Sequence, residues 1–268
     1  MNVIVITGAS EGIGAEMARQ WALRGRGDVA LVLAARGLEG LEAVAASCRA
    51  SGATVLVQRC DVGLQADCIE LIAAAMRSFG RIDMLVNNAG MSAQALFAEV
   101  HDLAWTEHVM RINHWGSVWC THAALEALKA SRGRIVAVSS LAGLVGVPGR
   151  TAYCASKFAM TGFFEALRVE LAVSGVSVTI AYPGVVATQI RHHGLNALGE
   201  AAGSSGLDER GAMSVEACAR LIVAGAEARK RDVVMTAKGR LGRWIKLIAP
   251  GIVDRLALEA LKQEVRPR

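Results

Sequence analysis

The chain has 268 residues, of which 53% are hydrophobic and 20% are charged, and its formal net charge is +5. This length suits one large α/β domain, and the composition excludes an extensively disordered chain. Lys and Arg are scattered without aromatic platforms, which argues against nucleic-acid binding and favours an anionic cofactor or an acidic membrane surface as the partner.

Short apolar runs alternate with longer segments of helical periodicity. The runs predict buried strands over Val3–Ile6, Val29–Ala34, Thr54–Gln58, Met84–Val86, Arg134–Val138, Val176–Ala181 and Val233–Thr236. The longer segments predict helices over Ala15–Arg24, Leu38–Ala50, Ala66–Ser78, Trp105–Ala130 and Tyr153–Ser174. This alternation predicts the α/β class: a doubly wound Rossmann fold, with a parallel seven-stranded sheet between two layers of helices and a C-terminal helical extension.

Residues 1–238 are expected to form a single Rossmann-type domain, and 239–268 an amphipathic helical extension. Gly194–Gly211 is rich in small residues, so we expect a mobile substrate lid near 189–212. In the extension, Pro250 separates two short helices in which basic residues alternate with apolar ones. Such a segment can lie on an anionic membrane, or it can cover the substrate pocket or a neighbouring subunit.

The six cysteines form no C-x-x-C pair, so we expect reduced thiols in a cytoplasmic protein and no metal site. Cys154 is expected to contribute packing rather than chemistry. The N-terminus lacks a charged segment followed by a long apolar run, which argues against a secretory signal. No uninterrupted apolar stretch reaches about eighteen residues, so no spanning helix is expected.

A glycine-rich turn, from Thr7 to Gly14, ends the first predicted strand and leads directly into a helix. Glycines let the backbone turn sharply and approach a pyrophosphate, and a helix N-terminus offers free N–H groups to an anion. The glycine spacing is G-x-x-x-G-x-G. With a strand before it and a helix after it, the turn predicts dinucleotide binding.

The end of the second strand indicates which dinucleotide is preferred. It carries Arg36 and no acidic residue that would bind an adenosine ribose and select NAD(H). Arg36 can pair with a 2′-phosphate and Ser10 can donate to it, which favours NADP(H). Two points stand against this interpretation: Arg36 can equally be a solvated residue at a strand end, and the Glu11 carboxylate is unfavourable near a phosphate.

Further motifs follow in order along the chain. They are Asn87-Asn88-Ala89-Gly90 after the fourth strand, Asn113 in the next helix, Ser139-Ser140 after the fifth strand, Tyr153-Cys154-Ala155-Ser156-Lys157 in the helix after it, and Pro183-Gly184-Val185-Val186-Ala187-Thr188 after the sixth strand. Together with the glycine turn, this order resembles the short-chain dehydrogenase/reductase family over about residues 1–190. The tail is similar to the branch that acts on steroid- and lipid-like carbonyls.

The resemblance implies a cofactor site spread over several loops. We expect the pyrophosphate region at Gly8, Gly12, Ile13 and Gly14 with Ser10 and Glu11 in the same turn, the adenine at Asp61 and Val62, the ribose at Asn88, Ala89 and Gly90, and the nicotinamide at Pro183, Gly184, Val186 and Thr188. Tyr153 and Lys157 would also contact the cofactor.

The implied catalytic residues are Asn113, Ser140, Tyr153 and Lys157. Tyr153 and Lys157 are four residues apart, so they lie on one helical face. A nearby ammonium lowers the pKa of a phenol, which would let Tyr153 act as general acid or base. Ser140, thirteen residues before Tyr153, would hold the substrate oxygen, and Asn113 would hold a water that connects Lys157 to solvent.

We therefore expect an NADP(H)-dependent oxidoreductase that interconverts a carbonyl and a secondary alcohol by hydride transfer, on an apolar steroid- or lipid-like substrate. The alternative is a non-catalytic NADP(H)-binding sensor or scaffold on the same fold, which the complete set of Ser140, Tyr153 and Lys157 disfavours. A homodimer or homotetramer is expected, in the cytoplasm, with peripheral membrane contact through the C-terminal segment as an open alternative.

Overall fold

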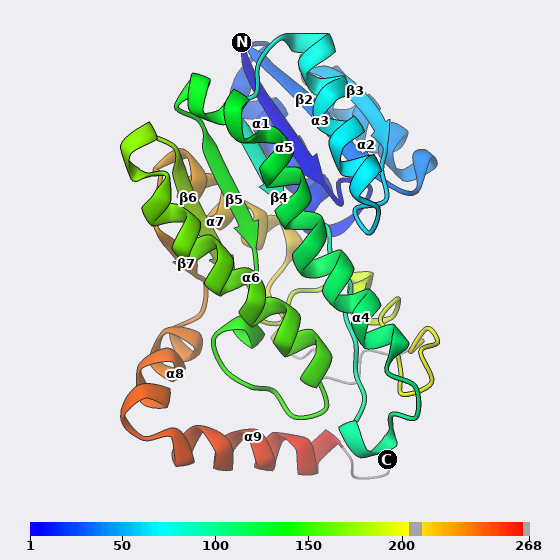
Figure 1. Ribbon diagram of the computed structural model, residues 1–268, viewed down its shortest axis with the longest axis vertical. Coiled ribbons are helices and arrows are strands. Elements are labelled where there is room, and N and C mark those ends of the chain that lie inside the picture. Colours follow the sequence, from blue (N-terminus) through cyan, green and yellow to red (C-terminus); the bar gives the residue numbers. More distant parts are fainter. Residues whose placement is uncertain (204–210, 265–268) are drawn as a thin grey trace.

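A computed structural model describes residues 1–203 and 211–264 (Figure 1). Seven strands in this part of the chain form one sheet in the order β3-β2-β1-β4-β5-β6-β7, and every neighbouring pair is parallel. Their bounds are β1 Asn2–Thr7, β2 Val29–Ala35, β3 Thr54–Arg59, β4 Met84–Asn87, β5 Arg134–Val138, β6 Ser177–Tyr182 and β7 Asp232–Val234. The predicted α/β class, sheet and strand number are confirmed.

The helices form two layers around the sheet and a separate pair at the C-terminus. Their bounds are α1 Gly12–Gly25, α2 Leu38–Ala50, α3 Gln65–Phe79, α4 Ala104–Met110, α5 Gly116–Ser131, α6 Thr151–Glu170, α7 Val215–Glu227, α8 Ala237–Ile248 and α9 Pro250–Glu264. Buried side chains of α3, α5 and α6 pack on one face of the sheet, and those of α1, α2 and α7 pack on the other.

Strand β1 shows why the strands are continuous apolar runs in the amino-acid sequence. Val3 and Val5 pack in the core on the side of α3, α5 and α6, whereas Ile4 and Ile6 pack in the opposite core. Successive side chains of a strand point to opposite faces, so a strand that is covered on both sides must be apolar at every position.

The order of the strands creates a crevice at the sheet's centre. From β1 the chain moves outward to β2 and β3, and then returns to β4 on the other side of β1. The loops after β1 and β4 therefore leave the sheet in opposite directions. Ligands of doubly wound folds bind at such a switch point, outside the carboxyl ends of the strands.

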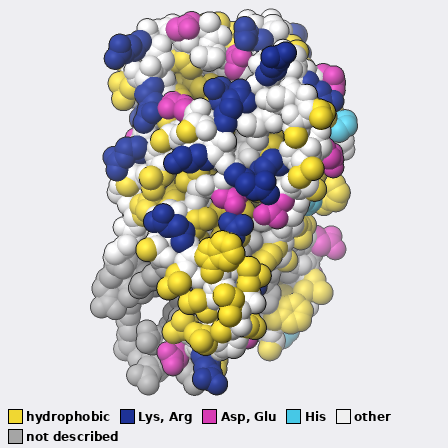
Figure 2. All heavy atoms as spheres, turned by 90° about the vertical axis from the view of Figure 1, so that its left-hand side faces the viewer, with side chains coloured by type: hydrophobic (Ala, Val, Ile, Leu, Met, Phe, Trp, Pro, Cys, Tyr) yellow, Lys and Arg dark blue, Asp and Glu magenta, His cyan; other side chains and the backbone are white. Residues whose placement is uncertain are grey.

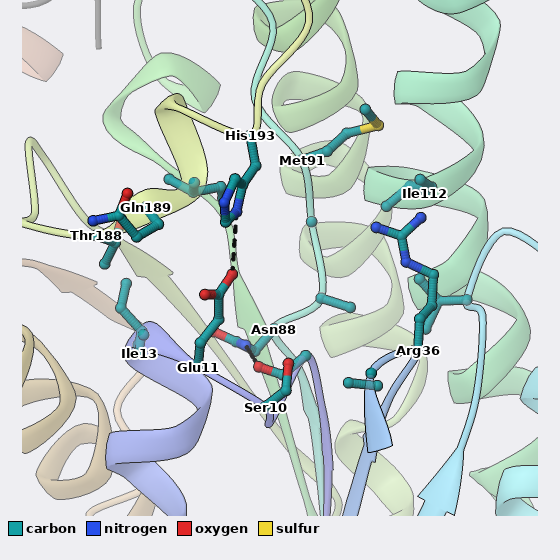
Figure 3. A pocket seen from close by; sticks show the side chains of 18 of the residues that line it. Ser10, Glu11, Ile13, Arg36, Asn88, Met91, Ile112, Thr188, Gln189 and His193 are labelled. Carbon is teal, nitrogen blue, oxygen red and sulfur yellow. Dashed lines mark hydrogen bonds and ion pairs between the residues drawn. The ribbon is translucent and has the colours of Figure 1, made fainter. Parts of the chain in front are cut away.

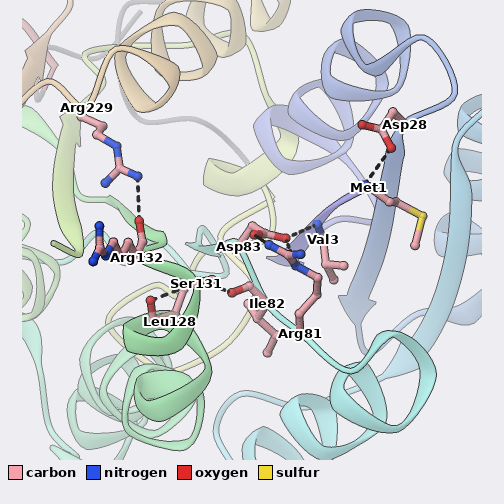
Figure 4. Close-up of polar contacts among 10 residues, drawn as sticks. All are labelled: Met1, Val3, Asp28, Arg81, Ile82, Asp83, Leu128, Ser131, Arg132 and Arg229. Carbon is pink, nitrogen blue, oxygen red and sulfur yellow. Dashed lines mark hydrogen bonds and ion pairs between the residues drawn. The ribbon is translucent and has the colours of Figure 1, made fainter. Parts of the chain in front are cut away.

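At the opposite, amino ends of the strands, polar side chains fix the turns (Figure 4). The Asp83 carboxylate accepts a hydrogen bond of 2.9 Å from the Val3 backbone N–H and pairs with the Arg81 guanidinium. Arg229 donates to the Arg132 carbonyl oxygen at 2.7 Å. The first of these contacts sets how β4 enters the sheet beside β1, and so aligns the carboxyl ends of both strands.

Two predicted helices differ from those observed. The single helix predicted over Trp105–Ala130 is divided into α4 and α5 by a π-helical turn at Arg111–Trp115. Helix α6 ends at Glu170, and the last residues of the predicted segment form a short 3₁₀ turn instead. Apolar periodicity cannot distinguish an α-turn from one locally wider turn, because both keep the flanking apolar faces buried. Helix α7 lies outside the predicted set.

The C-terminal pair, α8 and α9, lies beyond the sheet at one end of the molecule (Figure 1), and Pro250 begins α9 as expected. Among the described helices, none combines the length and the hydropathy needed to cross a bilayer. Part of the lid predicted near 189–212 falls on 204–210, outside the described residues. Before that gap, Leu195 is anchored: its N–H donates to the Ser92 carbonyl oxygen at 3.0 Å, and its own carbonyl oxygen accepts from Gln94 at 2.8 Å.

Candidate active site

The glycine-rich turn after β1 is packed tightly against the loop that follows β4. Gly8 has a φ of +65°, and a Cβ atom placed on it would lie 2.8 Å from the Ala89 Cα. A Cβ atom on Gly14 would overlap the Gly8 carbonyl oxygen. Asn88 closes the contact, because its Nδ2 donates to the carbonyl oxygens of Thr7 and Gly8, each at 3.0 Å. Packing within the protein therefore demands glycine at positions 8 and 14, in addition to any approach of a cofactor.

The Thr7 side chain joins β1 to β4 at their carboxyl ends. Its hydroxyl donates to the Val86 carbonyl oxygen at 3.2 Å. It also accepts from the backbone N–H groups of Asn88 and Ala89, each at 3.0 Å. These hydrogen bonds hold the two diverging loops together at the base of the crevice.

The crevice opens as a cleft of about 370 Å³, here named the switch-point cleft (Figure 3). Twelve predicted cofactor residues line it: Gly8, Ser10, Glu11, Gly12, Ile13, Arg36, Asp61, Val62, Asn88, Ala89, Gly90 and Thr188. The residues that the sequence did not single out are Ala35, Gly37, Cys60, Met91, Ile112, Gln189, Ile190 and His193. Most are chain neighbours of the predicted residues, and that adjacency is the signal by which they could have been found.

The composition of the cleft fits the phosphates of a dinucleotide. Helix α1 begins at Gly12, and the residue before it, Glu11, makes no capping hydrogen bond with its side chain. The N–H groups of the first helical turn can therefore be donated to an anion, where the helix dipole also favours negative charge. Arg36 adds a guanidinium to the same cleft.

Glu11 and Arg36 point in different directions within the cleft (Figure 3). The Glu11 carboxylate faces His193, and its Oε1 lies 3.5 Å from the His193 Nδ1. Arg36 stands on the other side of the cleft, after β2. The carboxylate that appeared unfavourable near a phosphate is thus turned away from Arg36. Both members of the Glu11–His193 pair are largely exposed, so the pair itself adds little stability.

Asp61 and Val62 form the wall after β3. The Asp61 Oδ1 accepts from the Gly63 N–H at 2.9 Å, and the Asp61 N–H donates to the Asp67 Oδ2 at 2.9 Å. These hydrogen bonds shape the loop and leave the Val62 side chain nearly buried. A Cβ atom on Gly116 would lie 2.7 Å from the Val62 carbonyl oxygen, so α5 begins in direct contact with this loop.

Lys157 is buried one turn into α6, between β5 and the loop after β4. Its Nζ donates to the Val138 carbonyl oxygen at 2.9 Å and lies 5.9 Å from the centre of the Tyr153 ring. A Cβ atom on Gly90 would be 3.5 Å from the same Nζ, which places the ammonium directly behind the lining of the switch-point cleft. Burial lowers the pKa of Lys157 to about 8.

Tyr153 lies in the first turn of α6, near Ser140 and two arginines. Burial raises the pKa of the Tyr153 phenol, against the lowering effects of a hydrogen bond with Ser140 and of the charges of Arg150 and Arg191. The sequence predicts that Lys157 lowers this pKa. Ser140, Arg150 and Arg191 are the lowering groups here, and the effect of Lys157 stays a prediction.

The two serines after β5 point in different directions. Ser139 is buried, and its hydroxyl lies 3.2 Å from the Lys157 carbonyl oxygen and 3.1 Å from the Thr161 hydroxyl. Ser140 is only partly buried and accepts a hydrogen bond from the Ala142 N–H at 3.1 Å. The Ser139 hydroxyl is therefore engaged within the core, whereas the Ser140 side chain lies beside Tyr153.

Asn113 lies within the π-helical turn and is completely buried. Its Oδ1 accepts from the Met91 N–H at 2.8 Å, and its Nδ2 donates to the Met91 carbonyl oxygen at 3.0 Å and to the Ser156 hydroxyl at 2.9 Å. The side chain thus ties the loop after β4 to α6. The Asn113 Oδ1 can accept a second hydrogen bond, and the expected water between Lys157 and solvent stays a prediction.

The loop after β6 brings Thr188 to the glycine turn. The Pro183 carbonyl oxygen accepts from Leu141 at 2.9 Å, and Val186 is buried. A Cβ atom on Gly12 would lie 3.5 Å from the Thr188 Cγ2. Of the predicted cofactor residues, those outside the lining of the switch-point cleft are Gly14, Tyr153, Lys157, Pro183, Gly184 and Val186.

The cysteines are free thiols and all six are buried. Cys154 accepts a hydrogen bond from the Val147 N–H at 3.3 Å, and burial raises the pKa of its thiol. In the described ranges, no group of three His, Cys, Asp or Glu side chains is arranged to hold a metal ion.

The sheet order, the glycine turn at the switch point and the helix that carries Tyr153 and Lys157 together define a Rossmann-type dehydrogenase. A family model described as short chain dehydrogenase matches residues 2–197. The chain therefore belongs to the short-chain dehydrogenase family, and it is an oxidoreductase acting on CH–OH groups.

Relatives agree with this assignment, and a solved structure agrees with the fold. An 11-beta-hydroxysteroid dehydrogenase A of Sesamum indicum is 37% identical over 259 residues, covering 94% of this chain and 73% of the relative. A dehydrogenase/reductase SDR family protein 7-like of Dictyostelium discoideum is 33% identical over 272 residues, covering 99% and 83%. An alcohol dehydrogenase from Thermococcus sibiricus, complexed with 5-hydroxy-NADP, shares the fold with a TM-score of 0.76 at 24% identity, covering 88% of this chain and 96% of that one.

Proposed function

We propose that this protein is an NADP(H)-dependent oxidoreductase that interconverts a carbonyl and a secondary alcohol, with Tyr153 as general acid and base. One observation carries the proposal: Tyr153, Ser140 and Lys157 converge at the carboxyl end of β5. Lys157 lies directly behind Gly90, and Gly90 lines the switch-point cleft. The proton-handling group and the nucleotide cleft are therefore adjacent.

The nicotinamide, when bound, supplies or accepts the hydride, so the protein has to supply a proton and an orientation. Ser140 donates a hydrogen bond to the substrate oxygen and holds it beside the phenol. Tyr153 gives its proton to that oxygen in reduction and takes it back in oxidation. Lys157 keeps a positive charge near the phenol, and the Val138 carbonyl oxygen fixes the position of its Nζ.

Ser10 and Arg36 support NADP(H) as the preferred cofactor. Both line the switch-point cleft, where a 2′-phosphate could accept hydrogen bonds from the guanidinium and the hydroxyl. Glu11 does not oppose this arrangement, because its carboxylate faces His193. The cellular NADPH pool is kept reduced, so a preference for NADPH would favour carbonyl reduction as the physiological direction.

An apolar, steroid- or lipid-like substrate is the second part of the proposal. Support comes from the relatives that are named as hydroxysteroid dehydrogenases, which match over 94% of this chain. Partly buried Leu141 and Leu144, directly after Ser140, place apolar surface next to the proposed proton donor.

We also propose a homo-oligomer that forms through the long helices. Trp115 stacks on Trp119 with the ring centres 6.0 Å apart, yet Trp115 remains 47% exposed. On α6, Phe158 and Val169 are 37% and 69% exposed. Light scattering after size exclusion tests this point: a mass of one chain would contradict it.

The tyrosine hypothesis is tested with a panel of apolar ketones, NADPH and NADH, followed by the loss of reduced-cofactor absorbance. Tyr153→Phe should abolish turnover and leave NADPH binding, measured by calorimetry, unchanged. Tyr182→Phe is the matched control, because Tyr182 is the other tyrosine of the chain and is buried at the end of β6. Near-normal turnover in Tyr153→Phe would refute the role of Tyr153. The non-catalytic NADP(H) sensor would be the better explanation if the parent protein bound NADPH but turned over none of the ketones.

The cofactor preference is tested separately with Arg36→Ala. We expect about a tenfold loss in kcat/KM for NADPH, with the value for NADH within about twofold of the parent, since one charge-assisted pair is removed. Arg24→Ala, at the far end of α1, is the control. A parent enzyme that prefers NADH would contradict the assignment of Arg36.

A further inference from the structure

Helix α8 is amphipathic, and two of its basic side chains, Arg243 and Lys246, turn toward the protein. Arg243 donates to the Asp232 carboxylate at 2.9 Å. One turn further on, Lys246 donates to the Leu144 carbonyl oxygen at 2.8 Å, and its Nζ lies 4.5 Å from the centre of the Phe158 ring. Two basic residues of α8 therefore attach the helix to β7, α6 and the loop after Ser140.

The apolar side of α8 faces outward. Leu241, Trp244 and Ile248 are 61%, 62% and 84% exposed, and their spacing of three and four residues places them on one stripe of the helix. We name these three residues the outer stripe. Leu247 beside it and Ile252 and Leu256 on α9 are also at least half exposed.

The exposed apolar side chains form part of a larger surface. Figure 2 views the molecule from the side that carries α8, and it shows hydrophobic side chains gathered over the lower part of this face, with Lys and Arg side chains spread above them. A surface helix normally buries its apolar stripe, because exposed apolar area costs free energy in water. A contiguous exposed patch of this kind indicates a binding surface.

The charge around the stripe indicates which partner fits. Helix α8 contains Lys238, Arg240, Arg243 and Lys246 and no acidic residue, and Arg240 is exposed beside the outer stripe. A second copy docked through the same stripe would bring two acid-free helices face to face. An anionic lipid surface instead accepts both features, since acyl chains take up the apolar side chains and phosphate groups pair with the cations.

We propose that the outer stripe of α8, together with the apolar side of α9, binds this protein peripherally to an anionic membrane surface. No part of the contact crosses the bilayer. The contact is with the α8 side of the molecule, next to the loop that carries Ser140: a Cβ atom on Gly239 would lie 2.5 Å from the Leu141 Cδ2. Membrane binding through α8 therefore holds the Leu141–Leu144 segment close to the lipid surface. This proposal does not depend on which reaction the protein catalyses.

The test is flotation of the full-length protein with vesicles of phosphatidylcholine alone and of phosphatidylcholine with phosphatidylserine. We expect the protein to float with the phosphatidylserine vesicles and to float less at high salt, because the cationic contribution is screened. The triple variant Leu241→Ser, Trp244→Ser, Ile248→Ser should reduce the bound fraction about tenfold or more, since it removes the inserted apolar side chains.

A matched control distinguishes membrane binding through α8 from non-specific adsorption of exposed apolar residues. Leu23→Ser, Ile69→Ser and Val173→Ser change three exposed apolar residues on other elements, and this variant should float like the parent. Thermal unfolding and NADPH binding of both variants confirm that each remains folded. Trp244 is part of the outer stripe, so its fluorescence reports directly on membrane binding. Its emission should shift to the blue when phosphatidylserine vesicles are added, and this shift should be missing in Trp244→Phe.

The proposal is overturned if the parent protein stays in the soluble fraction with both kinds of vesicle, or if the two triple variants lose binding equally. It is also overturned if the parent is a dimer that the outer-stripe variant converts to monomers without any vesicle binding by the parent, since a second copy of this chain would then be the partner. Loss of flotation in the outer-stripe variant alone, with NADPH binding retained, supports it.

Discussion

The switch-point cleft and the C-terminal helices differ in how closely their side chains are constrained. At the cleft, Thr7, Asn88 and Asn113 are fixed by several hydrogen bonds each, and Gly14 has no space for one more carbon atom. On α8, the outer stripe has no described protein neighbour that removes it from water, and a Cβ atom on Gly242 would meet nothing within 4 Å. At the cleft, contacts within the chain fix the side chains, whereas the outer stripe stays exposed among the described residues.

The largest effect is expected for Gly14→Ala. The added methyl group would overlap the Gly8 carbonyl oxygen, and we expect a loss of more than about 3 kcal/mol in the free energy of unfolding. Gly37→Ala is the control in the same cleft, because its φ is −87° and nothing lies within 4 Å. Equal unfolding midpoints in urea for the two variants would show that the cleft is less constrained than its contacts indicate.

Asn113→Leu should cost about 2–4 kcal/mol, because it leaves the partly buried N–H and carbonyl of Met91 and the buried Ser156 hydroxyl without their partner. Chemical denaturation measures this cost. Ser117→Ala serves as the comparison: the Ser117 hydroxyl makes only a 3.3 Å contact with the Asn113 carbonyl oxygen, so a change below about 1 kcal/mol is expected. A loss in Asn113→Leu no larger than that would contradict the bridging role.

The region around the cleft also contains a group whose burial opposes folding, the Lys157 ammonium. Its pKa falls from 10.5 to about 8 in the folded protein, so below about pH 8 the fold carries the cost of a buried ammonium. As the pH rises from about 8 toward 10.5, the unfolded chain holds this proton more strongly than the folded one, and the cost disappears.

Lys157→Met removes this dependence. Its unfolding free energy relative to the parent should therefore fall by about 2 kcal/mol between about pH 7 and about pH 10. Denaturation at several pH values measures the difference, which also cancels the pH-independent loss of the bond to Val138. A difference that is constant with pH would show that the ammonium is not buried as described.

The smallest effect has the opposite sign. Gly242→Ala lies inside α8 with open space around it, and we expect a gain of up to about 1 kcal/mol from helix propensity. Gly239→Ala on the same helix should destabilise, since its Cβ would lie 2.5 Å from the Leu141 Cδ2. Calorimetry of the two variants measures their unfolding temperatures. A higher value for Gly242→Ala than for Gly239→Ala would distinguish the exposed side of α8 from the side that packs on the protein.

The fold could be predicted because its signals are local. Each buried strand must be apolar at every position, and the turn around Gly8 and Gly14 is recognisable from its spacing between a strand and a helix. The π-helical turn could not be predicted, because it depends on the contact of Asn113 with Met91, which lies on a distant loop. The positions of His193 opposite Glu11 and of Lys246 on Phe158 likewise depend on long-range packing that no local pattern encodes.

In the π-helical turn at Arg111–Trp115, the number of residues itself determines how α4 is oriented relative to α5. A π-turn accommodates one residue more than an α-turn in the same stretch of helix. Deletion of one residue from this turn would leave the composition almost unchanged, but closing it to α-geometry would rotate α4 by about 100° relative to α5. Asn113 would then face away from Met91 and α6. Within this segment, the number of residues is therefore as strict a requirement as their identity, and insertions or deletions should be tolerated less well than most substitutions.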